Sequence, residues 1–287
     1  RNDIINVKDK VIEFETGNVL IGSVSRLYMS NKCLLIADHK SVDKQIHIFN
    51  KNDFSYLTSI GNFGEGPEEI TVMGCLAIDE AHHQLYVSDH AKQKIFSYDM
   101  DSVMVDSLYK PQVKTAMNET LFPSEYQYIN DTLSIAVLIK PTSTSTFNQF
   151  LGRWNMNTGE MIPMKYTHPD IQKKRITFAA SEKAGIYVEC YTRHDLMTIC
   201  SLDGELLYNI YGPDWDGGNG NKLQSFGTVM IGNDKIFVSY CGEDYARDSF
   251  PTKILVFDLE GNYLKTLETG YKISDCCYDS FNNRIIL

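Results

Sequence analysis

Two aspartate–histidine pairs, Asp38-His39 and Asp89-His90, stand in equivalent places, each directly after an apolar stretch. Carboxylate oxygens and imidazole nitrogens are common ligands of divalent metals, so two such pairs at one rim could hold an ion. The alternative is that each aspartate caps a turn by accepting hydrogen bonds from backbone N–H groups, which leaves both histidines exposed. Because both aspartates stand at the end of an expected strand, we favour the turn-capping role. The metal site remains a hypothesis.

Three glutamates, Glu65, Glu68 and Glu69, flank Pro67 in a glycine-rich segment. Neighbouring carboxylates can bind Ca²⁺ or act as a general acid and a general base. More commonly, the glycines of such a segment form a tight junction and one glutamate accepts hydrogen bonds from backbone N–H groups or from an arginine. We favour the structural role, and we include the three glutamates in the predicted binding surface.

Two long polar segments contain aromatic side chains that could contact a ligand. The first, Asp214–Asn221, lacks the acidic spacing of a calcium loop, and we expect it to display Trp215 for stacking on a sugar or a peptide. The second, Cys241–Pro251, combines Tyr245 and Arg247 with acidic residues, which is the composition of a contact loop. A solvated hairpin explains the second segment equally well.

The composition argues against several other function classes. The net charge is −10 and the pI is about 5.2, whereas nucleic-acid binding needs clustered basic residues. No apolar run is long enough to span a membrane as a helix. The sequence motifs of serine hydrolases, P-loop enzymes, zinc proteases and dinucleotide-binding enzymes are missing, so we assign no catalytic residue. The seven cysteines form no CxxC pair, and we expect buried thiols.

A repeated pattern supplies the elements that must position these residues. An apolar alternating run, a polar turn and a second short run occur five times, starting at residues 46, 95, 151, 197 and 254, on average 52 residues apart. The pattern predicts a β-hairpin, and another pair of strands precedes each copy. A period of this size with four short strands is typical of a β-propeller blade.

The two ends of the chain carry the remaining strands. Ile273–Tyr278 and Arg284–Leu287 begin a sixth unit, and Val11–Phe14 alternates like one further strand. We expect this N-terminal strand to pair with the C-terminal blade and close the ring, because closure removes exposed strand edges. The prediction is one all-β domain over residues 1–287, a six-bladed β-propeller with four-stranded antiparallel blades. A seven-bladed ring or a pair of β-sandwiches is the alternative.

The segment Ser59–Ile70, which reads SIGNFGEGPEEI, and the strand-like QLYVSD at Gln84–Asp89 carry a family resemblance. They resemble the linker and strand motifs of NHL-like and TolB-like bacterial six-bladed propellers, although Glu68 stands where those families commonly have glycine. The resemblance implies an exported or lipid-anchored protein of the cell envelope. The start at Arg1 fits the removal of a signal or anchor segment, and equally a boundary within a longer chain.

Propeller geometry separates the loops into two faces. Links between blades and links between second and third strands share one face, and the tight turns, such as the one expected at Asp101-Ser102, share the other. By this rule the first face receives the long insertions, Gly61–Ile70, Lys110–Pro123, Pro141–Asn148, Lys165–Lys174, Gly212–Lys222 and Cys241–Thr252. Long loops on a rigid scaffold commonly carry binding residues.

The sequence therefore predicts a non-enzymatic binding or scaffold module of the cell envelope that recognises a protein, peptide or glycan on its insertion-rich face. The alternative is a divalent-metal-dependent hydrolase or lyase of the lactonase type. In that case Glu69 and the two aspartate–histidine pairs would converge at the mouth of the channel, with Ca²⁺ or another divalent ion as cofactor. The fold alone does not choose between the two.

Overall fold

The computed structural model describes residues 1–220 and 222–287; Asn221, at the end of the predicted Trp215 loop, lies outside the described residues. Strands and loops make up nearly all of the described chain. The α-helix in it is α1 (Met100–Val105), and short 3-10 turns cover Lys8–Lys10 and Tyr245–Arg247. No helix in this part of the chain has the length and hydrophobicity to cross a membrane.

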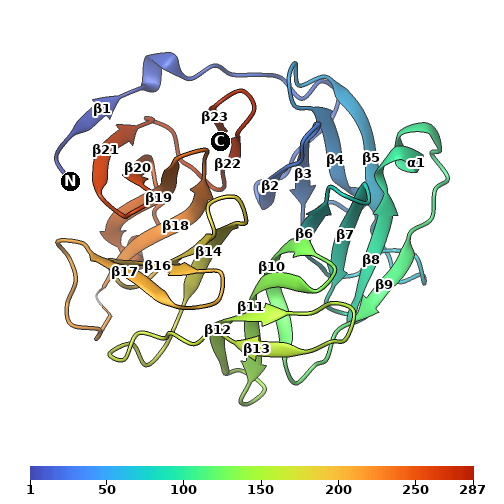
Figure 1. The fold of residues 1–287 in the computed structure, drawn as a ribbon. Helices are drawn as coiled ribbons and strands as arrows, with labels where there is room; N and C mark the ends of the chain where they lie inside the picture. Colours follow the sequence, from blue (N-terminus) through green and yellow to red (C-terminus); the bar gives the residue numbers. More distant parts are fainter. Residues whose placement is uncertain (221) are drawn as a thin grey trace. The chain divides into compact units, whose positions relative to one another are not determined.

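Contacts within the chain divide it into two compact units. We call Phe14–Pro163 the contiguous unit, and Arg1–Glu13 together with Met164–Leu287 the discontinuous unit. Apart from the N-terminal strand β1 (Ile4–Asn6), the strands of each sheet form an antiparallel meander, in which strands adjacent in sequence are also adjacent in the sheet (Figure 1).

The contiguous unit contains three four-stranded sheets. Their strands are β2 (Ser25–Met29), β3 (Cys33–Asp38), β4 (Lys44–Asn50) and β5 (Tyr56–Asn62); β6 (Met73–Asp79), β7 (Gln84–Asp89), β8 (Lys94–Asp99) and β9 (Gln112–Ala116); and β10 (Phe122–Asn130), β11 (Leu133–Pro141), β12 (Phe147–Trp154) and β13 (Met161–Pro163). Each sheet has the strand order of a propeller blade.

The discontinuous unit contains two larger sheets and one small one. The strands are β14 (Ile176–Ser181), β15 (Ile186–Tyr191), β16 (Leu196–Ser201) and β17 (Leu206–Tyr211); β18 (Leu223–Ile231), β19 (Lys235–Asp244), β20 (Lys253–Asp258) and β21 (Tyr263–Glu268), to which β1 (Ile4–Asn6) adds; and β22 (Cys277–Asp279) with β23 (Arg284–Ile286). The predicted all-β propeller of four-stranded antiparallel blades is confirmed.

The core lies between neighbouring sheets, which explains why the middle strands are the most apolar. Every residue of β3 and of β15 is buried. In the discontinuous unit, Ile199 and Ile210 from one sheet belong to the same buried cluster as Leu255 and Phe257 from the next. Each fully buried side chain of this kind contributes about 1.5–3 kcal/mol to stability.

The N-terminal strand differs from the predicted one. Val11–Phe14 forms no strand, and the Phe14 ring instead stacks on Phe54 with 4.0 Å between ring centroids. Strand β1 (Ile4–Asn6) pairs with β21 of the last four-stranded sheet, in parallel, with Ile4 opposite Thr266. The N-terminal strand therefore adds to the fifth repeat unit, from another segment of the sequence than expected, and not to the sixth unit that β22 and β23 form.

The connection after β8 also differs from the prediction. The expected strand at 103–105 is helix α1, because the Asp99 carboxylate accepts the Ser102 N–H at 2.8 Å and caps the helix, while Val103 is buried beneath it. The fourth strand of this blade is β9, inside the segment predicted as the Lys110–Pro123 insertion. The tight turn expected at Asp101-Ser102 is therefore wrong, and that connection is long.

All seven cysteines are buried and none forms a disulfide, which confirms the expected buried thiols. Burial raises the pKa of the Cys190 thiol well above its ordinary value, so the thiol remains protonated at neutral pH.

Candidate functional site

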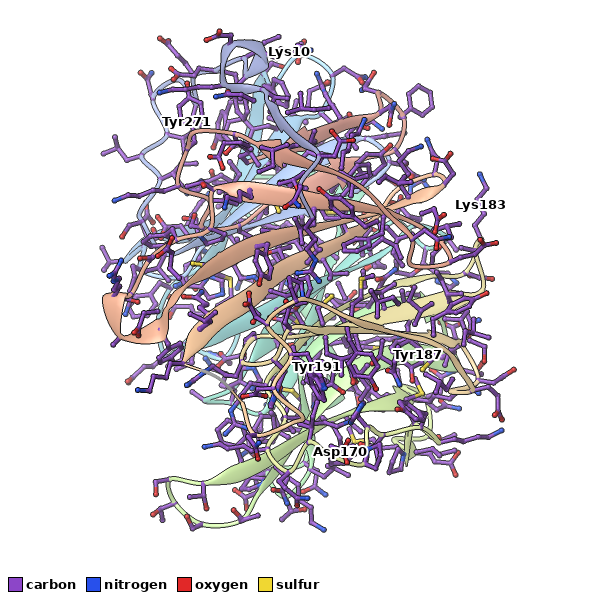
Figure 2. All side chains as sticks on the ribbon, turned by 90° about the vertical axis from the view of Figure 1, so that its left-hand side faces the viewer. Lys10, Asp170, Lys183, Tyr187, Tyr191 and Tyr271 are labelled. Carbon is purple, nitrogen blue, oxygen red and sulfur yellow. The ribbon has the colours of Figure 1, made fainter. Side chains whose placement is uncertain are left out.

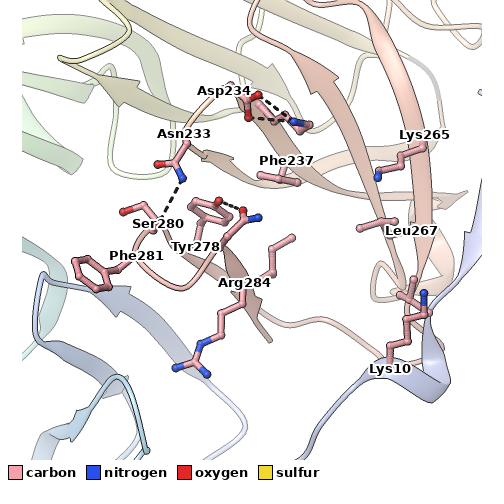
Figure 3. A pocket seen from close by; sticks show the side chains of 14 residues that line it. Lys10, Asn233, Asp234, Phe237, Lys265, Leu267, Tyr278, Ser280, Phe281 and Arg284 are labelled. Carbon is pink, nitrogen blue, oxygen red and sulfur yellow. Dashed lines mark hydrogen bonds and ion pairs between the residues drawn. The ribbon is translucent and has the colours of Figure 1, made fainter.

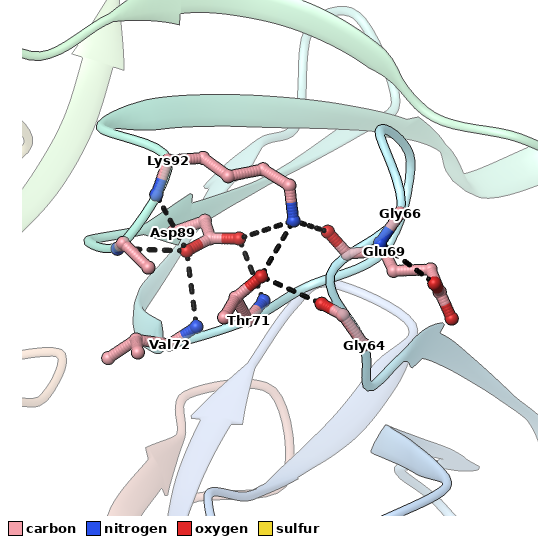
Figure 4. Close-up of polar contacts among 8 residues, drawn as sticks. Gly64, Gly66, Glu69, Thr71, Val72, Asp89 and Lys92 are labelled. Atoms are coloured by element: carbon pink, nitrogen blue, oxygen red, sulfur yellow. Dashed lines mark hydrogen bonds and ion pairs between the residues drawn. The ribbon is translucent and has the colours of Figure 1, made fainter.

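Asp89, at the end of β7, is a structural cap rather than an open ligand. Its carboxylate is fully buried and accepts four backbone N–H bonds, from Thr71, Val72, Ala91 and Lys92 (Figure 4). Burial alone would raise the pKa of Asp89, but these hydrogen bonds lower it, so the group stays ionised. The Lys92 ammonium lies 3.4 Å from the same carboxylate.

The other aspartate–histidine pair behaves similarly. Asp38 accepts the backbone N–H of Gly22 at 2.8 Å and of Lys40 at 3.1 Å. His39 Nε2 lies 3.2 Å from the Gly74 carbonyl oxygen, and His90 packs against a phenylalanine ring. The structure does not gather Asp38, His39, Asp89 and His90 into one set of metal ligands; the aspartates take the capping role that the turn pattern favoured.

The glycine-rich linker is built around Glu69. The Glu69 carboxylate accepts the Gly66 N–H at 2.9 Å, and a Cβ atom at Gly64 or Gly66 would overlap that carboxylate (Figure 4). The Lys92 ammonium closes the linker by donating to the Glu69 carbonyl oxygen and to Thr71 Oγ1, each at 2.7 Å. Glu69 thus holds the junction between the first two blades of the contiguous unit.

Glu65 and Glu68 are exposed on the same linker. Lys110 Nζ lies 3.5 Å from Glu68 Oε2, a surface ion pair of small energetic weight. Neither Glu65 nor Glu68 shares a hydrogen bond with Glu69. The two exposed side chains can contact a ligand, but they are not arranged as an acid–base pair with Glu69.

Trp215 lies in a cluster of four rings in the discontinuous unit, which we call the Trp215 cluster: His168, His194, Tyr211 and Trp215. The indole centroid is 5.3 Å from that of His168, 6.0 Å from His194 and 5.0 Å from Tyr211. Trp215 is half-buried and Tyr211 is 49% exposed. The expected freely displayed indole is instead held by edge-to-face contacts, which leave a preformed, partly open aromatic surface.

Loops from one edge of the sheets build this cluster. Trp215 follows β17 and His194 follows β15; the second and fourth strands of a meander run in the same direction, so they end at the same edge. His168 comes from the long segment before β14. Tyr191 and Asp170, which are labelled in Figure 2, adjoin the cluster: the Tyr191 ring is 5.9 Å from His194, and the Asp170 N–H donates to His168 Nδ1.

Both histidines of the cluster are neutral at pH 7. Burial lowers the pKa of His168 and of His194. His168 Nδ1 accepts a hydrogen bond from Asp170, so the proton is on Nε2, which donates to the Tyr211 hydroxyl at 2.9 Å. His194 Nδ1 is buried and has no hydrogen-bond partner among the residues the structure describes. The open surface therefore consists mainly of ring faces, and the unpaired His194 Nδ1 lies beneath it.

A buried ion pair, Lys174–Glu189, connects the segments that carry the Trp215 cluster. Glu189, on β15, accepts a short hydrogen bond from the Tyr191 hydroxyl, and Lys174 Nζ lies 3.7 Å from the same carboxylate. Both charged side chains are less than a tenth exposed, so their interaction is weakly screened by water. This ion pair ties the segment that carries His168 to the sheet that carries His194.

The predicted contact residue Tyr245 is linked to the same loops. The Arg193 guanidinium stacks over the Tyr245 ring, with 4.1 Å to its centroid, and Arg193 directly precedes His194. Tyr245 is 54% exposed, while Arg247 pairs with Glu243 at 3.6 Å. The structure thus places Trp215, Tyr245 and Arg247 in one unit; the sequence analysis missed His194 and Arg193, which lie in a short turn without any motif.

A family model described as a 6-bladed beta-propeller, DUF5128, matches residues 2–151, more than half of the chain. The chain belongs to this DUF5128 family. The family description agrees with the predicted blade number, while the narrower resemblance to NHL-like and TolB-like propellers stays a prediction. No curated protein matches the chain.

Solved structures with a similar fold come from several sources. A Bacteroides fragilis NCTC 9343 protein predicted to be exported has 15% identity and a TM-score of 0.56, over 91% of this chain and 74% of that one. A member of the DUF4221 family from Bacteroides vulgatus ATCC 8482 has 9% identity and a TM-score of 0.54, over 89% and 84%. U3-55K has 11% identity and a TM-score of 0.61, over 93% and 89%. At such identities the likeness concerns the fold alone.

The discontinuous unit of this DUF5128 propeller also contains a pocket of about 660 Å³ (Figure 3). Phe237 and Leu267 form its apolar wall, and four cations line it: Lys10, Lys235, Lys265 and Arg284. The pocket borders the two-stranded sheet β22–β23. On the opposite side of the β18–β21 sheet, β16 and β17 pack against β20 and β21.

Metal-ligating side chains meet at another place in the contiguous unit of the DUF5128 chain. Within residues 1–220 and 222–287, the group whose ligand atoms all lie within 4.8 Å of one another is Asp79, His82 and Asp131. None of the three was selected from the sequence, because Asp131 is distant in sequence from the other two and only the packing of two blades brings them together.

Proposed function

We propose that this propeller is a non-enzymatic binding module that recognises a protein, peptide or glycan through the Trp215 cluster and the adjoining Tyr245 loop. The observation that carries the proposal is the set of ring contacts that holds Trp215 half-buried while Tyr211 and Tyr245 remain about half exposed. Rigid, partly open aromatic surfaces bind sugar rings and peptide side chains at a low cost in conformational entropy.

The rings of the site are uncharged, while three exposed acidic residues lie beside them: Asp170, Asp214 and Asp216. The two histidines are uncharged at pH 7, and the nearby cation Arg193 is already stacked on Tyr245. We also propose an extracytoplasmic location. It is supported by the similar fold of the Bacteroides fragilis protein predicted to be exported.

Intrinsic fluorescence provides a direct test. The chain has two tryptophans, and Trp154 is 2% exposed in the core, so Trp154→Phe leaves Trp215 as the only indole. Titration of this variant with a panel of soluble glycans and peptides should reveal ligands that shift the Trp215 emission. Replacing Tyr211 or Tyr245 by alanine should then weaken binding about tenfold or more, which corresponds to ~1.4 kcal/mol.

Phe281→Ala is the matched control, because Phe281 is an aromatic side chain of the same unit that is 84% exposed and lies outside the Trp215 cluster. Its affinity should equal that of the parent. Ligands that bind equally well to Trp215→Ala, Tyr245→Ala and Arg247→Ala variants would contradict the proposal.

The second function considered, a divalent-metal-dependent hydrolase or lyase, draws no support from the aspartate–histidine pairs. The carboxylates of Asp38 and Asp89 are occupied by backbone N–H groups. We therefore assign no reaction step to Asp38, His39, Asp89, His90 or Glu69.

A further inference from the structure

Three side chains from two neighbouring blades meet in the contiguous unit. Asp79 ends β6, His82 lies in the turn before β7, and Asp131 lies in the turn between β10 and β11. Strands β6 and β10 are packed against each other, which brings the two turns together. One carboxylate oxygen from each aspartate and an imidazole nitrogen lie within 4.8 Å of one another. That spacing lets a single ion contact all three side chains.

The two carboxylates are held in place by buried phenols. Tyr86 donates its hydroxyl to Asp79 Oδ2 at 2.7 Å, and Tyr128 donates to Asp131 Oδ1 at 2.5 Å. The two tyrosine rings are themselves packed edge to face, with centroids 5.3 Å apart. In metal sites of proteins, residues that do not touch the metal donate hydrogen bonds to the ligating carboxylates and so fix their orientation.

The charges of this group are unbalanced. In the described part of the chain, no lysine or arginine forms an ion pair with Asp79 or Asp131, and His82 Nδ1 lies 2.8 Å from Asp79 Oδ2. The Lys114 ammonium lies 5.4 Å from the centre of the Tyr86 ring, and its charge also acts on His82, but it makes no ion pair with either aspartate. Asp79 is 1% exposed, and hydrogen bonds from the His82 backbone N–H and the Tyr86 hydroxyl compensate part of the cost of burying its charge; a cation would add a positive charge beside the two carboxylates.

The ligand set selects the type of metal. One imidazole and two carboxylates suit Zn²⁺, whereas Ca²⁺ and Mg²⁺ prefer oxygen ligands alone. The His82 side chain is 56% exposed, which leaves access from solvent and room for a water ligand. We propose that Asp79, His82 and Asp131 bind one Zn²⁺ ion that joins the turns of two neighbouring blades. This site shares no residue with the proposed ligand-binding surface.

Zn²⁺ titration of the metal-free protein, followed by thermal unfolding and metal analysis, tests the proposal. The wild type should retain one equivalent of Zn²⁺ after gel filtration and should melt at a higher temperature when Zn²⁺ is present. His82→Gln and Asp131→Asn should each weaken Zn²⁺ affinity about tenfold or more and abolish the shift. Asp131→Asn retains an oxygen that can accept the Tyr128 hydrogen bond, so this variant separates loss of charge from loss of packing.

His83→Gln is the matched control, since His83 is the next residue and its side chain is equally exposed, at 56%, but it lies outside the group. It should bind Zn²⁺ like the wild type. Co²⁺ in place of Zn²⁺ should give the visible spectrum of nitrogen and oxygen ligands. No Zn²⁺ retained, equal losses in His82→Gln and His83→Gln, or a thiolate-type Co²⁺ spectrum from the cysteines would each overturn the proposal.

Discussion

At the scale of single residues, the Glu69 carboxylate explains why the linker between β5 and β6 contains glycine at positions 64 and 66. Gly64 and Gly66 lack side chains because the Glu69 carboxylate folds back over their backbone and accepts the Gly66 N–H. The Lys92 ammonium then fixes the linker by bonding to Glu69 and to Thr71. A pattern that suggested acidic chemistry in the sequence is, in the structure, a compact junction.

Gly66→Ala tests this explanation. The added Cβ would lie 2.5 Å from Glu69 Oε1, so the carboxylate must move, and we expect the free energy of unfolding to fall by about 1–3 kcal/mol. Urea denaturation measures the change. The double variant Gly66→Ala/Glu69→Ala should lose less than the sum of the two single losses, because the clash is gone; strict additivity would contradict the explanation.

The Trp215 cluster gives a prediction about pH. Burial lowers the pKa of His168 and His194 in the folded protein, whereas in the unfolded chain both titrate near the ordinary value of about 6.5. As the pH falls through that value, the unfolded state takes up protons first, so the free energy of unfolding decreases. The melting temperature should therefore fall between about pH 7 and pH 5.

His194→Gln should reduce this pH dependence, since a side chain that does not titrate replaces one of the two histidines. Thermal unfolding of the wild type and of His194→Gln across the pH range measures the difference. An unaltered slope in His194→Gln would show that this imidazole is not kept neutral by burial.

At the scale of elements, the sequence predicts most accurately the β-hairpins, which depend on interactions between residues close together in the chain. The repeated runs starting at residues 46, 95, 151, 197 and 254 fall in β4, β8, β12, β16 and β20, the third strand of each blade. Alternation of apolar side chains and small polar turn residues suffices for these hairpins. Helix α1 was missed because Val103-Met104-Val105 alternates like a strand, while the Asp99 cap and the buried place for Val103 depend on the packed blade.

The candidate site was less predictable for a related reason. Trp215, Tyr245 and Arg247 could be selected by residue type and loop length, but His168 and His194 gain their roles from contacts between loops distant in sequence. Asp131 joins Asp79 and His82 only because β10 packs on β6. Contacts of this kind leave no spacing pattern for sequence reasoning to detect.

At the scale of the whole molecule, we propose that the two units belong to one propeller domain, as the family description of six blades suggests. Each unit contains one tryptophan, Trp154 in the contiguous unit and Trp215 in the discontinuous unit. The single-tryptophan variants Trp215→Phe and Trp154→Phe therefore report separately on the two units.

We expect both variants, after correction for their own stability changes, to give coincident urea transitions, because a single domain unfolds cooperatively. The urea midpoints from tryptophan fluorescence are compared with those from far-UV circular dichroism, recorded on the same samples. Two separated midpoints, each seen by only one tryptophan, would mean that the units unfold as independent domains.

The pairing of β1 with β21 bears on how the protein is made. Ile4–Asn6 is synthesised more than two hundred and fifty residues before its partner, Thr266–Glu268. During translation the contiguous unit can complete its three blades while the ribosome is still adding residues 164–287. Strand β1 thus leaves the ribosome before every other described strand, and its edge stays unpaired until β21 has been made.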